Sequence, residues 1–496
     1  MFDTVLIANR GEIALRVIRA CREEGLRSVA VYSTPDREAP HVLAADQAVE
    51  LGGATPAESY LSEKLLLKAA ADTGAGAIHP GYGFLAESAK FARSVGDSNL
   101  TFIGPPPAAI EEMGDKPRAR ARMVAAGVPV VPGSCELSSI ASAREAAEEV
   151  GFPVMIKAAG GGGGKGMHVV QDPADLAVAF ERAQREAEGA FGDGRIYLEQ
   201  FLLRPRHIEI QILADEHRTL HLGERECSIQ RRHQKLIEEA PAPCVDQALR
   251  EKLGAVAVRA AEAVGYLGAG TVEFLLKGSD FFFLEMNTRI QVEHPVTEMV
   301  TGVDLVREQL RIALGYPALD GSDAPSPRGH ALECRISAED PQKDFLPSVG
   351  RVESLEIPMG PGIRWDGGIR VGFEVGLHYD PLLGKLIVHA ENRARAIERM
   401  QVALEELWVD GLETTQAYHL SVLGEEDFRE GDLSIEYVRE HPELLRSVDP
   451  NLRKVAIATA VLCENHLDRE VSAGAIKDKK VVGQRLSPWM QAGREW

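Results

Sequence analysis

Residues 271–287, TVEFLLKGSDFFFLEMN, contain two apolar runs separated by Gly278-Ser279-Asp280. Apolar runs of this length on either side of a short glycine-containing turn predict a β-hairpin. We expect Lys277 to pair with Phe281 across the turn, and this pairing fixes the register of the whole hairpin. The hairpin therefore decides which polar side chains of the segment share a face.

The predicted register places two carboxylates, Glu273 and Glu285, opposite each other on one face. At about 5 Å and an effective dielectric of about 20, their repulsion costs roughly 3 kcal/mol. A divalent cation removes this cost, and oxygen ligands suit Mg²⁺ or Mn²⁺ better than zinc. Asn287 shares the face and adds a third oxygen donor. The alternative is a solvated hairpin with both glutamates in water, which the neighbouring apolar side chains disfavour.

Polar residues continue to alternate after the hairpin, in NTRIQVEHP: Asn287, Arg289, Gln291 and Glu293. If the chain stays extended, all four line one surface beside the predicted metal site. An arginine next to a carboxylate is commonly a structural ion pair. Beside a site for a metal and a nucleotide, the same pair can bind a small oxyanion and remove a proton from it.

A glycine-rich segment lies between two predicted strands, 152–158 and 167–170. Six of the seven residues 160–166 are glycine, and ordering them costs about 3–6 kcal/mol relative to alanine. Close approach of backbone N–H groups to phosphate explains such a segment, so we expect a movable lid over phosphates rather than a flexible linker. It is not a P-loop, because Gly166 follows Lys165. Lys157, in the preceding strand, either faces solvent or points at an anion.

The segment CSIQRRHQKLIEEAP concentrates positive charge in Arg231, Arg232, His233 and Lys235. The whole chain carries a formal charge of −20, so this segment is a local exception. A solvated run of charges is one interpretation. A cradle for phosphate or bicarbonate is the other.

Composition limits the classes of function. The 496 residues correspond to about three domains, and the charge of −20 argues against nucleic-acid or membrane-surface binding. The six cysteines form no CxxC pair, so neither a disulfide framework nor a zinc site is expected. With no apparent signal sequence and no apolar run of about 18 residues, we expect a cytoplasmic protein.

The first 114 residues predict an α/β unit built on a parallel sheet. Strands 4–8, 28–32, 76–79 and 101–104 alternate with helices, and NRGE and HPGYGF are loops that follow strands. Loops of this kind often carry ligands. The first strand is followed by NRGEIA, whose single glycine excludes the G-x-G-x-x-G fingerprint of a nicotinamide-binding fold.

Several motifs in this order closely resemble biotin carboxylase, a member of the ATP-grasp superfamily, from residue 2 to about 440. They are ANRGEIA, HPGYGFLAE, IGP, MGDK, IKAAGGGGGKGM, RHIEIQ, SIQRRHQKLIEEAPAP, GAGTVEF, EMNTRIQVEHPVTE and ECRISAED. The resemblance implies an ATP-grasp fold, α/β and in part α+β. It implies an N-terminal Rossmann-like domain (1–114), a linker (115–130), a glycine-loop lid (131–203), the core and C-terminal domain (204–445) and an extension (446–496).

The resemblance also implies roles for matching residues. Those expected at the ATP phosphates are Lys116, Lys157, Gly163 and Gly164. Those expected around adenine and ribose are Glu199, Gln200, Phe201, Leu202, His207, Gln230 and His233. The metal-binding positions are Glu273, Glu285 and Asn287, and the bicarbonate pocket comprises Lys235, Arg289, Val292 and Glu293, with Glu293 as base. Arg335 is expected to face the biotin enolate, and Tyr82 lies near the biotin end.

The implied reaction uses ATP, two Mg²⁺ or Mn²⁺ ions and bicarbonate to make carboxyphosphate, whose CO₂ carboxylates biotin. The chain has no Met-Lys-Met segment, the usual site of biotin attachment, and no room for a carboxyltransferase. We therefore expect a separate biotin carboxyl carrier protein and carboxyltransferase subunits, as in acetyl-CoA or acyl-CoA carboxylase. The ATP-dependent component of a two-subunit pyruvate carboxylase is the alternative. Arg16, Arg19 and Glu23 match a family dimer surface, so a homodimer is expected, although a charged solvent face also fits.

Other functions remain as competitors at this stage. A different ATP-grasp carboxylate ligase, such as one that makes carbamoyl phosphate, needs ammonia and no biotin. A silent nucleotide-binding scaffold predicts loss of the metal ligands or the base, yet Glu273, Glu285, Glu293 and Arg335 are all present. A nicotinamide dehydrogenase is excluded by the first glycine loop.

Overall fold

The computed structural model describes residues 2–134, 136–159, 167–232, 234–446 and 459. Contacts divide the chain into two units, 1–447 and 448–496, and of the second only Thr459 is described. The extension predicted from residue 446 thus lies almost entirely outside the described residues. None of the described helices is both long and apolar enough to span a membrane.

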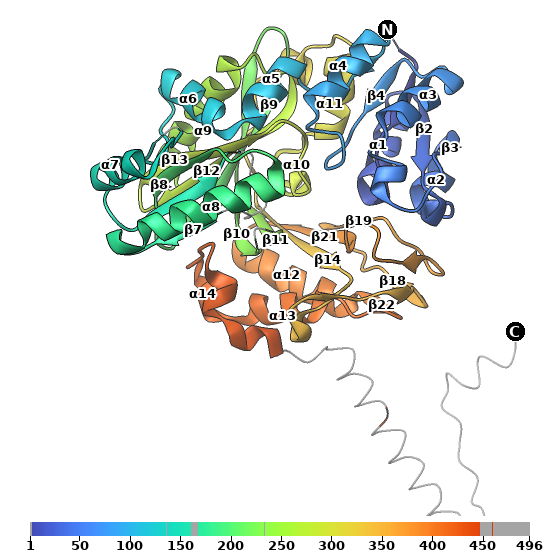
Figure 1. Cartoon of the computed structure of the whole chain (residues 1–496). Coiled ribbons are helices and arrows are strands. Elements are labelled where there is room, and N and C mark those ends of the chain that lie inside the picture. Colours follow the sequence, from blue (N-terminus) through green and yellow to red (C-terminus); the bar gives the residue numbers. More distant parts are fainter. Residues whose placement is uncertain (1, 135, 160–166, 233, 447–458, 460–496) are drawn as a thin grey trace, which may run out of the picture. The chain divides into compact units, whose positions relative to one another are not determined.

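The N-terminal part forms the predicted parallel sheet, in the order β3-β2-β1-β4-β5 (Figure 1). Its strands are β1 (Thr4–Ile7), β2 (Arg27–Tyr32), β3 (Gln47–Glu50), β4 (Ala77–His79) and β5 (Thr101–Phe102). The helices are α1 (Gly11–Glu23), α2 (Pro40–Ala44), α3 (Glu63–Thr73) and α4 (Ala89–Asp97). The prediction of an α/β unit is confirmed.

The two predicted site loops meet where β1 and β4 end. The amide of Asn9 donates hydrogen bonds to the carbonyls of Pro80 and Tyr82, both at 2.7 Å. Gly81 has φ +63°, and a Cβ there would lie 2.8 Å from the Asn9 amide nitrogen. Only glycine fits this position without strain, so the loop stays close to the first strand.

A small antiparallel sheet carries the glycine-rich segment. Its order is β7-β6-β8, with β6 (Val154–Ala158), β7 (Met167–Val170) and β8 (Ile196–Gln200). The sheet packs its apolar side against α7 (Ile140–Val150) and α8 (Leu176–Phe191). The predicted hairpin of β6 and β7 is therefore present, whereas residues 160–166 between them lie outside the described residues.

The largest sheet of residues 1–447 is an antiparallel sheet of eight strands, in the order β13-β12-β9-β10-β11-β14-β21-β19. Its bounds are β9 (Arg206–Ala214), β10 (Thr219–Arg231), β11 (Gln234–Ala240), β12 (Gly268–Lys277), β13 (Asp280–Asn287), β14 (His330–Ser337), β19 (Ile363–Gly367) and β21 (Leu382–Ala390). One apolar cluster packs β9, β12 and β13 against α5 (Pro107–Gly114), α6 (Lys116–Ala125) and α9 (Gln247–Ala263). Another packs β14 and β21 against α12 (Arg393–Glu406) and α13 (Gln416–Gly424).

Shorter elements complete the fold. Helices α10 (His294–Thr301) and α11 (Leu305–Ala313) follow the hairpin, and α11 packs on α1. The remaining elements are β15 (Glu339–Asp340), β16 (Leu346–Pro347), β17 (Gly350–Arg351), β18 (Ser354–Glu356), β20 (Glu374–Val375), β22 (Trp408–Asp410), α14 (Glu426–Glu430) and α15 (Tyr437–Glu440).

The register of the β12–β13 hairpin differs from the predicted one near the turn. Lys277 pairs with Asp280, not with Phe281, because the turn contains two residues, Gly278 and Ser279, and Gly278 has φ +62°. A β-bulge between Glu273 and Phe274 inserts one extra residue in β13. The bulge compensates for the shorter turn, so Glu273 still lies opposite Glu285.

Candidate active site

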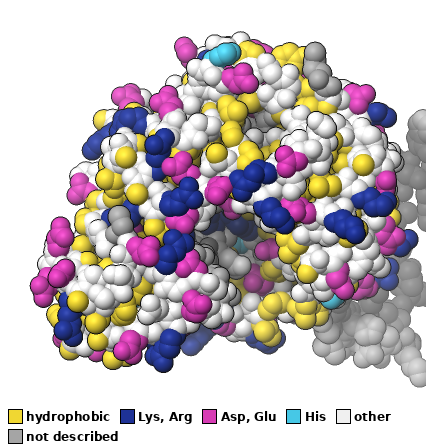
Figure 2. Space-filling model, turned by 45° about the horizontal axis from the view of Figure 1, so that its top comes forward, with side chains coloured by type: hydrophobic (Ala, Val, Ile, Leu, Met, Phe, Trp, Pro, Cys, Tyr) yellow, Lys and Arg dark blue, Asp and Glu magenta, His cyan; other side chains and the backbone are white. Residues whose placement is uncertain are grey.

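A cavity of about 350 Å³ opens beside the β12–β13 hairpin. Figure 2 shows one face of the molecule, where Lys and Arg side chains surround a central hollow. The predicted site residues that line the cavity are Lys116, Lys157, His207, Gln230, Lys235, Glu273, Glu285, Asn287, Arg289, Val292, Glu293 and Arg335. Most of the predicted residues are therefore brought together around one space.

The two glutamates of the hairpin line the cavity in different surroundings. Glu273 is buried and accepts hydrogen bonds from Asn287 (2.9 Å) and Gln291 (2.6 Å). Burial alone would raise the pKa of Glu273, but Lys235 and His207 hold it below its ordinary value. The side chain of Glu285 is 39% exposed and forms an ion pair with Lys116 (3.2 Å).

The donor set on this wall fits a hard divalent cation. Glu273, Glu285 and Asn287 offer carboxylate and amide oxygens on neighbouring positions of one hairpin. Oxygen donors of this kind suit Mg²⁺ or Mn²⁺. The carboxylate of Glu273 remains anionic, as a ligand must, because its pKa is low.

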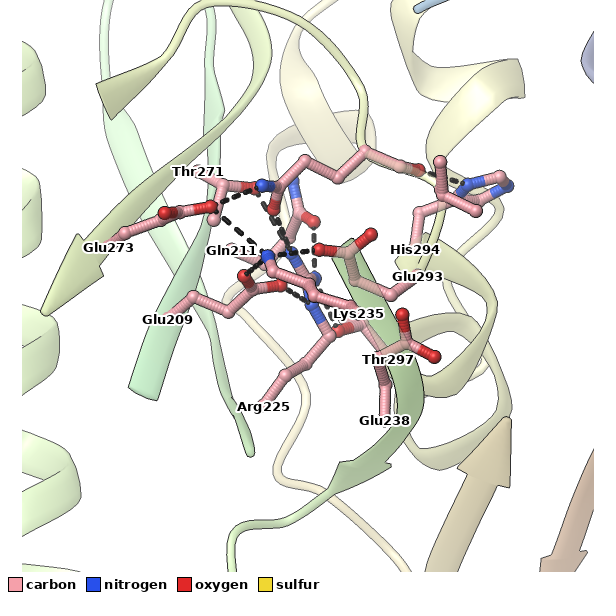
Figure 3. A network of polar contacts seen from close by, with 12 residues as sticks. Glu209, Gln211, Arg225, Lys235, Glu238, Thr271, Glu273, Glu293, His294 and Thr297 are labelled. Atoms are coloured by element: carbon pink, nitrogen blue, oxygen red, sulfur yellow. Dashed lines mark hydrogen bonds and ion pairs between the residues drawn. The ribbon is translucent and has the colours of Figure 1, made fainter. Parts of the chain in front are cut away.

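Lys235 is the centre of the charge network in Figure 3. Its ammonium group donates to three carboxylates, those of Glu209, Glu273 and Glu293. Burial opposes the charged form, but these three carboxylates raise the pKa of Lys235 well above its ordinary value. Lys235 therefore stays a cation and keeps three acidic side chains together.

Glu293 is the residue before the first turn of α10, at the meeting point of two cations. Its carboxylate accepts hydrogen bonds from Lys235 and, at 2.9 Å, from Arg335. Burial would raise the pKa of Glu293, but Lys235 and Arg335 lower it well below its ordinary value. Glu293 is thus held ionised, the form that can accept a proton.

A fully buried arginine, Arg225, which was not predicted from the sequence, holds several residues of this network in place. Arg225 donates to Glu209, to Gln211 (2.6 Å) and Thr297 (2.9 Å), and to Thr271 and Gln291 (both 3.0 Å). It thereby fixes Glu209, which binds Lys235 (Figure 3). It also fixes Gln291, which binds Glu273. One sequence signal could have indicated a buried cation here. His207, Glu209 and Gln211 alternate with apolar residues in the strand RHIEIQILA, so they share one face and need a polar partner.

The chain beyond β13 does not stay extended, the condition under which Asn287, Arg289, Gln291 and Glu293 were expected to share one surface. The strand ends at Asn287, and the backbone bends before α10 begins at His294. Arg289, Gln291 and Glu293 nevertheless line the same cavity as Asn287, because the bends keep these side chains on its wall. Arg289 contacts Glu87 (3.2 Å) and the side-chain oxygen of Asn287 (3.0 Å).

Only some of the residues predicted to bind the nucleotide line this cavity. Lys157 forms an ion pair with Glu199 (2.5 Å), which also binds Arg120 (2.9 Å), so these charges are paired with each other. Gln200, Phe201 and Leu202 follow at the end of β8 and are outside the lining of this cavity among the described residues. Gly163, Gly164 and His233 lie outside the described residues.

Only some cations of the positively charged segment CSIQRRHQKLIEEAP line the cavity. Arg231 and Arg232 both bind the carboxylate of Asp344 (2.7 Å each), because they lie where β10 turns into β11. Lys235 alone of the described cations in this segment enters the cavity. Among the described cations of this segment, Arg231 and Arg232 therefore pair with Asp344, and Lys235 lines the cavity.

A second cavity, of about 420 Å³, shares Lys235, Val292 and Arg335 with the first. It is also lined by Tyr82, whose hydroxyl donates to Glu12. Lys235 and Arg335 therefore stand at the boundary between two spaces. A reactive group made in one can meet a second substrate bound in the other.

These features define an ATP-grasp enzyme: a parallel N-terminal sheet, a glycine-containing hairpin, and an antiparallel sheet with paired glutamates beside lysines. Three family descriptions match the chain: "Biotin carboxylase, N-terminal domain" (1–110), "Carbamoyl-phosphate synthase L chain, ATP binding domain" (115–320) and "Biotin carboxylase C-terminal domain" (333–440). The chain belongs to the biotin carboxylase family and is an ATP-dependent ligase.

Named relatives agree with this family. "Biotin carboxylase" of Nostoc is 53% identical over 442 residues, which are 88% of this chain and 99% of that relative. A pyruvate carboxylase component of Methanothermobacter thermautotrophicus is 49% identical, over 92% of each chain.

Solved structures are similar as well. One is the biotin carboxylase domain dimer of Hydrogenobacter thermophilus 2-oxoglutarate carboxylase with MgADP, ADP and bicarbonate (46% identity, TM-score 0.86, 90% of this chain and 100% of that one). Another is a Campylobacter jejuni biotin carboxylase complex with a nucleotide (45% identity, TM-score 0.86, 89% of this chain and 99% of that one).

Proposed function

We propose that this chain carboxylates biotin on a separate carrier protein, using ATP and bicarbonate. The observation that carries the proposal is the placement of Lys235 and Arg335 where the two cavities meet, with Glu293 bound to both from the first cavity. The nucleotide and bicarbonate occupy the cavity with the paired glutamates, and biotin occupies the cavity with Tyr82. A neighbour in this family holds MgADP and bicarbonate, which supports the first assignment.

The lysines and the hairpin bind the triphosphate. Lys116 and Lys157, with Gly163 and Gly164, hold the phosphates, and the residues assigned to adenine and ribose are Glu199, Gln200, Phe201, Leu202, His207, Gln230 and His233. Glu273, Glu285 and Asn287 would hold the divalent cations. When bound, these cations offset charge on the transferring phosphoryl group.

Glu293 removes the proton of bicarbonate while Lys235, Arg289 and the Val292 segment hold the anion. The bicarbonate oxygen then attacks the γ-phosphorus, and the bond to the leaving ADP oxygen breaks. The resulting carboxyphosphate divides into CO₂ and phosphate, and this phosphate takes the N1 proton of biotin. Arg335 stabilises the enolate oxygen of biotin while its N1 attacks CO₂.

The assembly in which the chain works is also part of the proposal. The partners are a biotin carboxyl carrier protein and carboxyltransferase subunits, in a cytoplasmic acetyl-CoA or acyl-CoA carboxylase. A two-subunit pyruvate carboxylase is the second candidate, favoured by the relative from Methanothermobacter. A homodimer is supported by the dimeric neighbour and by a groove lined by Arg16, Arg19 and Glu23. The domain boundaries at 114, 130, 203 and 445 are part of the proposal.

The first experiment measures ADP release by the purified chain with Mg²⁺ and ATP. We expect release to require bicarbonate and to rise when free biotin or a biotinylated carrier is added. Ammonia should not replace biotin. Bicarbonate-independent release, or no response to biotin, would contradict the proposal.

Replacing Arg335 with serine distinguishes ATP cleavage with bicarbonate from the carboxylation of biotin. Its guanidinium lines both cavities, but the metal ligands and Lys235 stay in place. We expect biotin carboxylation to fall by about 100-fold or more, the typical loss of one oxyanion donor, while bicarbonate-dependent ATP cleavage falls less. Carboxybiotin formation and ADP release are measured side by side. An equal loss of both would remove the enolate role.

A further inference from the structure

Two buried glutamates, Glu238 and Glu333, are cross-strand partners beside Arg335. Glu238 on β11 is the register partner of Glu333 on β14, and both residues have no solvent exposure. Their sheet packs against α10 through Val296 and Val300. Neither carboxyl belongs to the set of residues assigned to substrate or metal.

The hydrogen bonds of this pair are unequal. Glu238 accepts a hydrogen bond from the Nε of Arg335 at 2.6 Å through one oxygen. The other oxygen of Glu238, and both oxygens of Glu333, are buried and have no hydrogen-bond partner among the described residues. Two ionised carboxylates in this position would repel each other with no water to screen them.

The charges that face the pair come from four elements. They are Lys235 on β11, Arg335 on β14, Lys385 on β21 and Glu293 at the start of α10. Lys385 is already engaged by the Val292 carbonyl (2.7 Å) and Glu12 (3.1 Å), so Glu333 has no dedicated cation among the described residues. Burial raises the pKa of Glu238 to about 7 and that of Glu333 well above its ordinary value, although Arg335 and Lys385 oppose the shifts.

We propose that Glu333 carries a proton and donates it to Glu238 in a hydrogen bond, so that Glu238 remains an anion and positions Arg335. The guanidinium of Arg335 is then held by Glu238 on one side and by Glu293, at 2.9 Å, on the other. Figure 3 shows Glu238 and Glu293 on the same side of the network around Lys235. Glu238 is a positioning residue, since it acts on biotin through Arg335; this rests on the proposed function of Arg335.

The pH dependence has a definite sign. Glu238 is an anion only above its raised pKa of about 7. Its hold on Arg335 is therefore half lost at this pH, complete well above it and lost well below it. The pKa of Glu293 is lowered, so the loss of the base occurs at much lower pH and does not hide this change.

Infrared difference spectroscopy of the resting full chain in D₂O tests the proton directly. We expect the wild-type protein to show the carbonyl stretch of a protonated carboxyl group that Glu333→Gln lacks. Glu391→Gln, at an exposed glutamate, is the control and keeps the band. A band that persists unchanged in Glu333→Gln overturns the proposal.

Kinetics test the positioning of Arg335. Glu238→Gln should lower carboxylation of biotin by about tenfold or more, the cost of a displaced catalytic group, and remove the decline below about pH 7. Glu333→Gln should stay within about twofold at neutral pH, because its amide donates the hydrogen bond that the protonated carboxyl provides. An equal loss in both variants, or an unchanged pH profile in Glu238→Gln, overturns the proposal.

The outcomes separate this inference from the proposed function. If wild-type protein shows no biotin-dependent carboxylation, the proposed function fails, and the infrared band still decides whether Glu333 is protonated. If Glu238→Gln does not fold, the comparison of wild type with Glu333→Gln remains decisive. Normal carboxylation without the infrared band contradicts only the inference.

Discussion

Replacing Glu293 with glutamine lowers bicarbonate-dependent ATP cleavage by about 10²–10⁴-fold, the typical contribution of a general base. The amide keeps the size of the side chain but cannot accept the proton of bicarbonate. Lys235 and Arg335 hold the pKa of the wild-type carboxylate low, so it is ionised and its oxygens are free to accept a proton. The rate is measured as ADP release with saturating ATP, Mg²⁺ and bicarbonate.

A matched control separates chemistry from folding. Glu391→Gln changes a glutamate whose side chain is 63% exposed, and it should cleave ATP at the wild-type rate. The affinity of Glu293→Gln for ATP, measured by equilibrium titration, should remain close to that of the wild-type protein. If Glu293→Gln retains more than about one tenth of the rate, another group is the base.

Replacing Glu285 with glutamine produces the second large loss. The hairpin presents this carboxylate, 39% exposed, opposite Glu273 and beside Lys116. A hard cation loses an anionic oxygen, so ATP cleavage at a fixed low Mg²⁺ concentration should fall by about 100-fold or more. A higher concentration of Mg²⁺ or Mn²⁺ should restore part of it, which is measured by titrating the metal.

The control for this variant lies on the same hairpin. Asp280→Asn removes an exposed carboxylate at the turn, where it pairs with Lys277 in the strand register. It should leave the metal requirement unchanged. If the metal titration curve of Glu285→Gln is the same as that of the wild-type protein, Glu285 is not a metal ligand.

The hairpin shows how far local sequence predicts a site. Pairing the two apolar runs across the glycine-containing turn correctly placed Glu273 opposite Glu285, although the predicted turn was one residue too long. The error was cancelled by the bulge after Glu273, which no sequence pattern indicated. The glycine-rich hairpin and the parallel first sheet were predicted for the same reason: strand and helix periods are set by neighbours within a few residues.

The site residues that escaped prediction bind partners far along the chain. Arg225 contacts Gln291 and Thr297, and Lys385 reaches Val292 and Glu12. Lys385 lies in the apolar strand β21, and Arg225 lies in a polar part of β10 between Glu224 and Glu226; neither position belongs to a recognised motif. For Arg231 and Arg232 the sequence left a solvated run of charges and an anion site both open. Asp344, more than 100 residues away, binds both arginines, which no local pattern indicated.

The sequence by itself determined the strands, the helices, the paired glutamates and the family, because these depend on short-range periodicity and on motifs in a fixed order. The tertiary structure decided which charges neutralise one another: Lys235 among three carboxylates, Arg335 between Glu238 and Glu293, and Glu333 without a hydrogen-bonded cation among the described residues. The reason is physical. Ionisation in a buried site depends on the few charges within several ångströms, and in this sheet strands distant in sequence bring those charges together.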